Sequence, residues 1–165
     1  MVVFQTERLR VRTLADTDYD HFYRLQGDPD VMRYIRPVKT REESDAALRE
    51  VLALPEPETG GRWMIEEKTS GRFVGTFAII PVPYDPLKIQ LGYAFVPESW
   101  GRGYATEVTR AGLAYFREHT KLNEIYAIAE TPNEASRNVL LKAGFSFLEK
   151  RKEEGKELLV FIVKW

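Results

Sequence analysis

The chain has 165 residues, the size of one ordinary domain with its own hydrophobic core, so we expect a single domain over residues 1–165. Its 24 basic and 25 acidic residues give a formal net charge of -1 and are interleaved, which argues against a protein that binds nucleic acid. The sequence holds no cysteine, so disulfides, thiolate metal sites and a cysteine nucleophile are excluded.

Two further absences narrow the class of protein. The start of the chain lacks the basic and apolar pattern of a signal peptide, and no apolar run approaches ~18 residues, so we expect a cytoplasmic protein with no membrane partner. His21 and His119 lie far apart in the sequence, so we expect no metal site.

The first predicted elements are a strand and a helix. Apolar residues alternate with arginines over residues 9–12, which predicts a strand with one face in water. Asp16 or Asp18 is then expected to cap a helix that buries Phe22 and ends before Pro29.

A second helix is predicted to begin at a capping box, in which Thr40 and Glu43 each bond the backbone of the other. Pro55 and Pro57 end its pattern, because proline cannot continue a helix. The segment 56–61 is predicted to be a mobile loop.

Three strands in succession are predicted next. Strands over 63–65 and 73–80 flank a glycine-containing turn at 68–71, which is typical of a hairpin. The prolines between positions 81 and 86 predict a stiff, irregular connection. A third strand covers 89–96 and ends at Pro97.

The second half predicts a helix over 105–116, a strand over 125–129, a short helix ending at Gly144, and closing strands over 145–147 and 158–163 around a turn at 153–155. This order predicts an α+β fold with a mixed, mainly antiparallel sheet. The strands that end near residues 96 and 129 are joined through a helix and should run parallel.

A glycine-rich loop stands where the third strand gives way to a helix. In the run from Trp100 to Glu107, Gly101 and Gly103 let the backbone approach a ligand, and the first helical N–H groups face an anion. The loop lacks the Lys-Ser/Thr of a P-loop and the third glycine of the dinucleotide fingerprint, so a phosphate other than that of NTP or NAD is indicated. A purely structural turn is the alternative, and Trp100 is expected to pack in the core.

A second motif follows the strand at 125–129, with Asn133, Ser136 and the pair Gly144-Phe145. With the loop and the opening Thr-Glu-Arg-Leu-Arg-Val-Arg, it resembles the acetyl-CoA-binding core of the GCN5-related N-acetyltransferase (GNAT) family. Within that family the chain is similar to the ribosomal-protein N-terminal acetyltransferases, the RimJ/RimL-like branch. The resemblance spans nearly the whole chain.

The resemblance implies a GNAT-type sheet with helices on both faces and a splayed parallel strand pair, which holds the pantetheine arm of acetyl-CoA. The residues that it implies for binding acetyl-CoA are Phe95, Val96, Gly101, Arg102, Gly103, Tyr104, Ala105, Thr106, Asn133 and Ser136. Two of these have open alternatives: Arg102 as a solvated loop residue, and Asn133 as a cap of the short helix, which is compatible with binding.

The catalytic residues are less clearly marked, because the chain departs from the family pattern twice. Leu140 replaces a frequent tyrosine proton donor, and Gln90 replaces a frequent glutamate base. The resemblance assigns Ser136 as proton donor to the departing thiolate. Water is one alternative donor, and Ser136 can instead be a helix-surface serine bonded to its own backbone. Glu66 and Glu130 are the nearest substitutes for the base by topology, and either can instead be a solvated carboxylate.

These features predict an acetyl-CoA-dependent N-acetyltransferase that acts on the α-amine of a protein or peptide N-terminus. Two alternatives stay open: an acetyltransferase of a small amine, such as an aminoglycoside, polyamine or amino acid, and a non-catalytic acyl-CoA-binding regulator. A homodimer is also left open.

Overall fold

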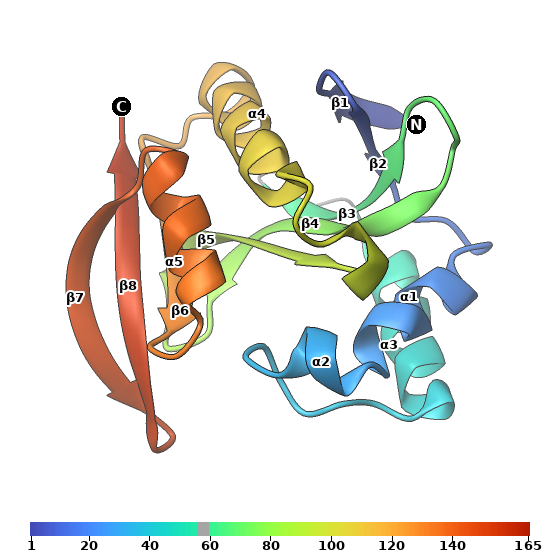
Figure 1. Cartoon of the computed structure of the whole chain (residues 1–165), viewed down its shortest axis with the longest axis horizontal. Helices are drawn as coiled ribbons and strands as arrows, with labels where there is room; N and C mark the ends of the chain where they lie inside the picture. Colours follow the sequence, from blue (N-terminus) through green and yellow to red (C-terminus); the bar gives the residue numbers. More distant parts are fainter. Residues whose placement is uncertain (56–59) are drawn as a thin grey trace.

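A computed structural model describes residues 1–55 and 60–165. Most of the loop predicted at 56–61 therefore lies outside the described residues. The described residues form one eight-stranded sheet with the strand order β1-β2-β3-β4-β5-β6-β8-β7 (Figure 1). The strands are β1 (Val2–Gln5), β2 (Leu9–Thr13), β3 (Gly61–Glu67), β4 (Phe73–Val82), β5 (Asp85–Phe95), β6 (Glu124–Glu130), β7 (Ser146–Glu153) and β8 (Lys156–Lys164).

The predicted α+β class with a mixed sheet is confirmed. Among the described residues, neighbouring strands pair antiparallel except β5 and β6, which run parallel. The helices are α1 (Tyr19–Gln26), α2 (Pro29–Met32), α3 (Arg41–Ala53), α4 (Tyr104–His119) and α5 (Glu134–Lys142), and a 3₁₀ turn covers Pro97–Ser99.

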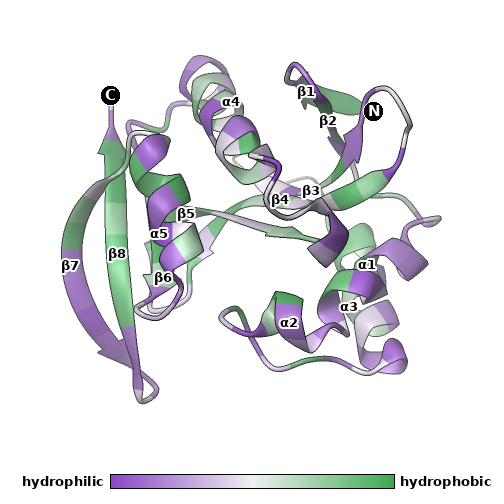
Figure 2. Ribbon diagram, viewed as in Figure 1, coloured by the Kyte–Doolittle hydropathy of each residue, from purple (hydrophilic) through white to green (hydrophobic). Residues whose placement is uncertain are grey.

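The helices cover both faces of the sheet, as predicted. On one face, Val108 and Phe116 of α4 and Leu140 of α5 belong to the larger apolar cluster. On the other face, α1, α2 and α3 bury apolar side chains against Met64 of β3 and Phe73 of β4. Figure 1 shows α1 to α3 gathered together, away from α4 and α5. In Figure 2, β8 is mostly apolar while the neighbouring edge strand β7 is mostly polar, as suits a strand with one free side.

Local sequence signals explain how the helices begin. Thr40 and Glu43 form the predicted capping box at the start of α3. Asp18 does occupy the N-cap position of α1, but its side chain makes no cap bond. It is 1% exposed and instead accepts from Arg12 Nη1 and Nη2, each over 2.8 Å, because a buried carboxylate gains more from a guanidinium than from an exposed helix end.

Three elements differ from the sequence prediction. The short strand β1 was not predicted, and neither was α2, which begins at Pro29 and is capped by Asp28. The first helix does end before Pro29 as predicted, since α1 stops at Gln26. The connection predicted between positions 81 and 86 is shorter than expected, because β4 continues to Val82 and β5 begins at Asp85. The predicted irregularity is present as a register shift between Pro81 and Val82, where proline cannot donate a ladder bond.

Candidate active site

The glycine-rich loop has the backbone expected of an anion site. Gly101 and Gly103 have φ of 74° and 79°, a region that favours glycine, and Gly103 is the N-cap of α4 without a side-chain cap. The bond from Glu107 N–H to the Gly103 carbonyl comes first in α4, so the N–H groups of Tyr104, Ala105 and Thr106 have no partner within the helix. These amides are the donors that a phosphate at this helix end would meet.

The side chain of Glu67 on β3 anchors the glycine-rich loop to the sheet. The Tyr104 hydroxyl donates to Glu67 Oε2 over 2.6 Å, and Arg102 Nη1 lies 3.8 Å from the same oxygen. The Tyr104 side chain is 5% exposed and packs against Phe95, so it is part of the core and only its backbone can face a ligand. Arg102 is half exposed, and its contact with Glu67 leaves it beside the loop.

Glu107 forms a second anchor, which links the start of α4 to the amino-terminal residues. This anchor was not predicted from the sequence. Glu107 Oε2 accepts from the Thr6 hydroxyl over 2.5 Å and from the Arg8 N–H over 3.1 Å, and Glu107 Oε1 accepts from Arg8 Nε over 2.8 Å. Arg8 Nη2 also donates to the Arg102 carbonyl over 2.9 Å. The only local sign of this anchor is an acidic residue in the first turn of a helix. Its partners lie about a hundred residues away along the chain, so the contact does not follow from local sequence.

The parallel strands β5 and β6 meet at one residue pair, Gln90 with Tyr126. Beyond it β5 extends away from β6 toward the start of α4 (Figure 1). The backbone of Val96 is not free to bind the pantetheine arm, contrary to the prediction. Both backbone groups of Val96 are engaged, since its N–H donates to Val74 and its carbonyl accepts from Ser99. Because ladder bonds alternate along a strand, Tyr93 and Phe95 turn their N–H groups to the gap instead.

Trp100 also differs from its expected role in the core. Its side chain is 50% exposed, and its indole N–H donates to the Phe95 carbonyl over 2.8 Å on the gap side of β5. The N–H of Phe95 is therefore the group at this residue that a ligand in the gap can reach.

The second motif meets β5 across the gap. Asn133 caps α5 by accepting from the Ser136 N–H over 3.2 Å, as one alternative predicted. The Ser136 hydroxyl oxygen lies 3.2 Å from the hydroxyl oxygen of Tyr93. Burial raises the pKa of Tyr93 above its ordinary value, and the bond with Ser136 opposes this only in part, so the phenol stays protonated at neutral pH. Sequence reasoning missed Tyr93, because the contact appears only when α5 packs beside β5.

Glu66 and Glu130, the two carboxylates predicted as candidate bases, lie on strands that are not neighbours in the sheet. Glu66 accepts from Arg10 Nη1 and Arg12 Nε, each over 3.0 Å. Burial raises its pKa, but the bonds from both arginines outweigh this and lower the pKa below its ordinary value, which makes Glu66 a poor proton acceptor. It also stands on β3, which β4 and β5 separate from β6 in the sheet.

Glu130 ends β6 at the open side of the strand pair, and its only ion pair among the described residues is with Lys156 Nζ at 3.8 Å. Gln90 stands on β5, where its side-chain amide donates to the Pro81 carbonyl over 3.4 Å.

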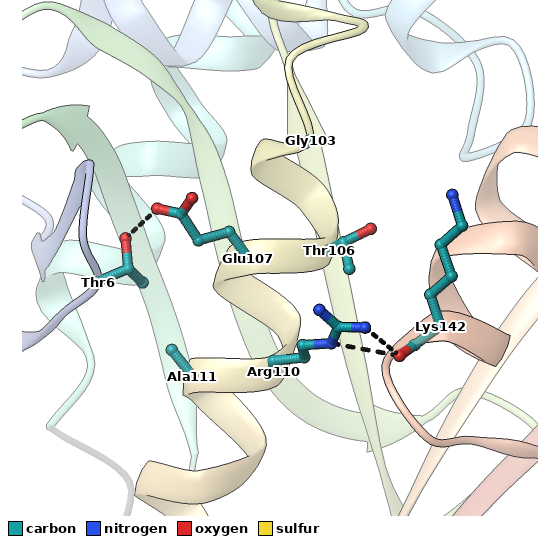
Figure 3. A pocket seen from close by; sticks show the side chains of 7 residues that line it. All are labelled: Thr6, Gly103, Thr106, Glu107, Arg110, Ala111 and Lys142. Carbon is teal, nitrogen blue, oxygen red and sulfur yellow. Dashed lines mark hydrogen bonds between the residues drawn. The ribbon is translucent and has the colours of Figure 1, made fainter.

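A hollow of about 690 Å³ lies beside the loop on the outer side of α4 (Figure 3). It is lined by Thr6, Gly103, Thr106, Glu107, Arg110, Ala111 and Lys142. Arg110 spans it and donates to the Lys142 carbonyl from Nε over 3.2 Å and from Nη2 over 2.8 Å. Two cationic side chains thus border the space next to the glycine loop.

The described part of the chain holds neither a metal-binding cluster nor a membrane-spanning helix. No group of three or more possible metal ligands occurs in residues 1–55 and 60–165. Over the same residues, no helix has the length and apolar character that crossing a bilayer requires.

The sequence profile of the acetyltransferase (GNAT) domain matches residues 8–146. An uncharacterized N-acetyltransferase of Bacillus subtilis, YoaA, is 29% identical over 145 residues, covering 87% of this chain and 82% of that protein.

Two solved structures share the fold. RimL, a ribosomal alpha-N-protein acetyltransferase in complex with coenzyme A, superposes with a TM-score of 0.84 at 12% identity and 99% and 98% coverage of the two chains. A spermidine N-acetyltransferase of Vibrio cholerae in complex with CoA and spermine gives a TM-score of 0.80 at 18% identity and 94% and 95% coverage. The family match over most of the chain, together with the glycine loop at the start of α4, makes this protein a member of the GNAT family and an acetyl-CoA-dependent acyltransferase.

Proposed function

We propose that the enzyme transfers the acetyl group of acetyl-CoA to the α-amine of a protein or peptide N-terminus. The observation that carries this choice is Gln90, whose side chain cannot take a proton near neutral pH, at the position on β5 where the family frequently has a base; its amide donates to the Pro81 carbonyl. An α-amine has a pKa near ~8 and a lysine or polyamine ammonium near ~10.4, so at pH 7.5 about a quarter of the former but about one in a thousand of the latter is neutral. A site without a strong base suits the amine that is already partly neutral.

In this proposal the loop from Gly101 to Thr106 binds the pyrophosphate of acetyl-CoA through its backbone N–H groups, and Arg102 assists. The pantetheine arm lies along β5 and bonds the gap-facing N–H groups of Tyr93 and Phe95. The adenosine part occupies the hollow bordered by Arg110 and Lys142. The positive φ of Gly101 and Gly103 and the cationic border of the hollow support this placement.

The reaction needs one new bond and two proton transfers. The neutral amine attacks the thioester carbonyl carbon, the carbon–nitrogen bond forms and the carbon–sulfur bond breaks. A backbone N–H of β5 at the gap polarises the carbonyl. The amine gives its extra proton to water, with Glu130 in place to accept it through that water. The thiolate takes a proton from Ser136, which Tyr93 can resupply because its hydroxyl is 3.2 Å away and remains protonated.

The comparison proteins leave the acceptor class open, since one solved structure of this fold is an alpha-N-protein acetyltransferase and another a spermidine N-acetyltransferase. A direct test measures kcat/KM for a peptide with a free N-terminus and for the same peptide N-blocked but bearing a lysine. Spermidine, aminoglycosides and free amino acids complete the panel. Preference for the lysine peptide or for a polyamine would overturn the proposal. Binding of acetyl-CoA with no turnover on any amine would favour the alternative of a non-catalytic acyl-CoA-binding regulator.

A further inference from the structure

Arg36 and Arg62 form a pair of neighbouring arginines without an acidic partner among residues 1–55 and 60–165. Arg36 lies between α2 and α3, and its Nη1 donates to Gln26 Oε1 over 3.4 Å. Gln26 is 6% exposed, so this hydrogen bond holds the Arg36 side chain against the interior of the protein. Arg62 belongs to β3, and within the described part of the chain its side chain has neither an ion pair nor a hydrogen bond.

The surroundings of both arginines disfavour their charge. Burial lowers the pKa of Arg36, and burial together with the positive charge of Arg36 lowers the pKa of Arg62. Two partly buried cations that repel each other reduce the stability of the empty protein. Other arginines at the sheet, such as Arg10 and Arg12, are neutralised by carboxylates, so the pair at Arg36 and Arg62 is an exception.

Arg62 stands on the same face of the sheet as an open space at Gly92 of β5. Arg62 of β3 lies opposite Ala78 of β4, and Ala78 lies opposite Gly92 of β5, so the three positions share one face of the sheet. This is the face of Met64, which packs against α1 to α3. A Cβ placed on Gly92 would meet no atom within 4 Å, so the space above Gly92 is open. Two strand spacings separate the backbones of Gly92 and Arg62, roughly 10 Å.

The arginine pair is not placed to bind the phosphates of the acyl donor. The glycine loop leads into α4, which packs on the opposite face of the sheet. Tyr93, next to Gly92, also packs on that opposite face, toward Ser136. An acceptor lying over Gly92 therefore reaches the gap from the α1–α3 face, the face of the sheet on which Arg62 stands.

We propose that Arg36 and Arg62 bind a carboxylate of the acceptor, so that the preferred substrate is an amine that carries an acidic group a few bonds away. For a peptide N-terminus this means Asp or Glu at the second or third residue. The inference rests on the proposed N-acetyltransferase function and narrows its acceptor. It also predicts that polyamines are poor substrates, because the arginine pair repels them.

The test uses the full chain and two peptides with free N-termini, Ser-Asp-Ala-Gly-Tyr and its neutral twin Ser-Asn-Ala-Gly-Tyr. Glutamine and its α-amide form a second pair, which differs in the α-carboxylate and tests a free amino acid as the source of the carboxylate. Wild type is expected to favour the acidic member of one pair by about tenfold or more in kcat/KM, the range of a charged hydrogen bond. Arg36→Gln and Arg62→Gln should each remove most of this preference, whereas Arg49→Gln, on an exposed part of α3, should keep it.

Thermal unfolding without substrate separates binding from a structural role. If Arg62 serves an anionic acceptor, Arg62→Gln should leave Tm unchanged or raise it, because a disfavoured charge is removed. A lower Tm together with an unchanged substrate preference would overturn the inference. Equal rates for the acidic and neutral members of both pairs in wild type would also overturn it while the proposed function stands. If no α-amine is acetylated at all, the proposed function fails, and the inference fails with it.

Discussion

The hydroxyl oxygen of Tyr93 lies 3.2 Å from that of Ser136, although 43 residues separate them in the sequence. The contact joins β5 to α5 across the side of the gap where the thioester is proposed to lie. It gives Ser136 a second hydroxyl as a source of protons, so the two residues are best tested together.

We expect Ser136→Ala to lower kcat by a factor within the ~10²–10⁴ range of general acid catalysis, with little change in the Kd for acetyl-CoA. Tyr93→Phe keeps the ring and removes only the hydroxyl, so it should lower kcat less if Tyr93 acts through Ser136. Steady-state kinetics and isothermal titration measure the two quantities. A loss of only two- or threefold in both variants would assign thiolate protonation to water.

Acetyl-CoA should raise the free energy of unfolding by about 2.7 kcal/mol at a hundredfold excess over Kd. Gly103→Asp should abolish this increase, because a carboxylate would meet the phosphates at the helix end. Gly103→Asn is the matched control, since both side chains tolerate positive φ and only aspartate is charged. Equal ligand-induced Tm shifts in wild type and both variants would remove the loop from the binding site.

The pair of Arg12 and Asp18 should make stability depend on acidity. Burial raises the pKa of Asp18, but bonds from Arg12, the Ala15 amide and His21 outweigh this and hold the pKa below its ordinary 3.8. A lowered folded-state pKa gives stability that is complete above the unfolded value and is lost as pH falls through the folded one. Tm should therefore fall below about pH 4, and Asp18→Asn should be less stable at pH 7 by roughly 3 kcal/mol and show a flatter acid limb. Parallel profiles for the two proteins would contradict this assignment.

Gly112 lets α4 approach the sheet. A Cβ there would lie 2.5 Å from Cζ of Phe77, a fully buried ring that also packs against Phe4 and Phe116. Gly112→Ala should destabilise by about 1–3 kcal/mol through overpacking, offset by about 1 kcal/mol of better helix propensity. Urea unfolding of Gly112→Ala, Phe77→Leu and the double variant tests the contact. The double variant should recover part of the loss, and strict additivity would argue against a clash.

The sequence predicts best what depends on neighbours along the chain. The capping box at Thr40 and the order of β3, β4 and β5 follow from local patterns. The fold class follows as well, because the crossover through α4 favours a parallel pair of β5 and β6.

Contacts set by packing could not be predicted in this way. Glu66 looks like a free carboxylate until the register of β2 and β3 brings Arg10 and Arg12 beside it. Val96 looks like a backbone donor until the alternation of ladder bonds turns its N–H to β4. In each case a partner from another strand decides the role of the residue.

The anchoring of Glu107 by Thr6 and Arg8 bears on how this protein is made and handled. The bond between Thr6 and Glu107 spans 101 residues, so the glycine loop acquires its foundation only after most of the chain has left the ribosome. For the same reason, the first eight residues are needed for the structure around the glycine loop. Removing them would take away Thr6 and Arg8, the partners of Glu107, and would leave the start of α4 without this anchor.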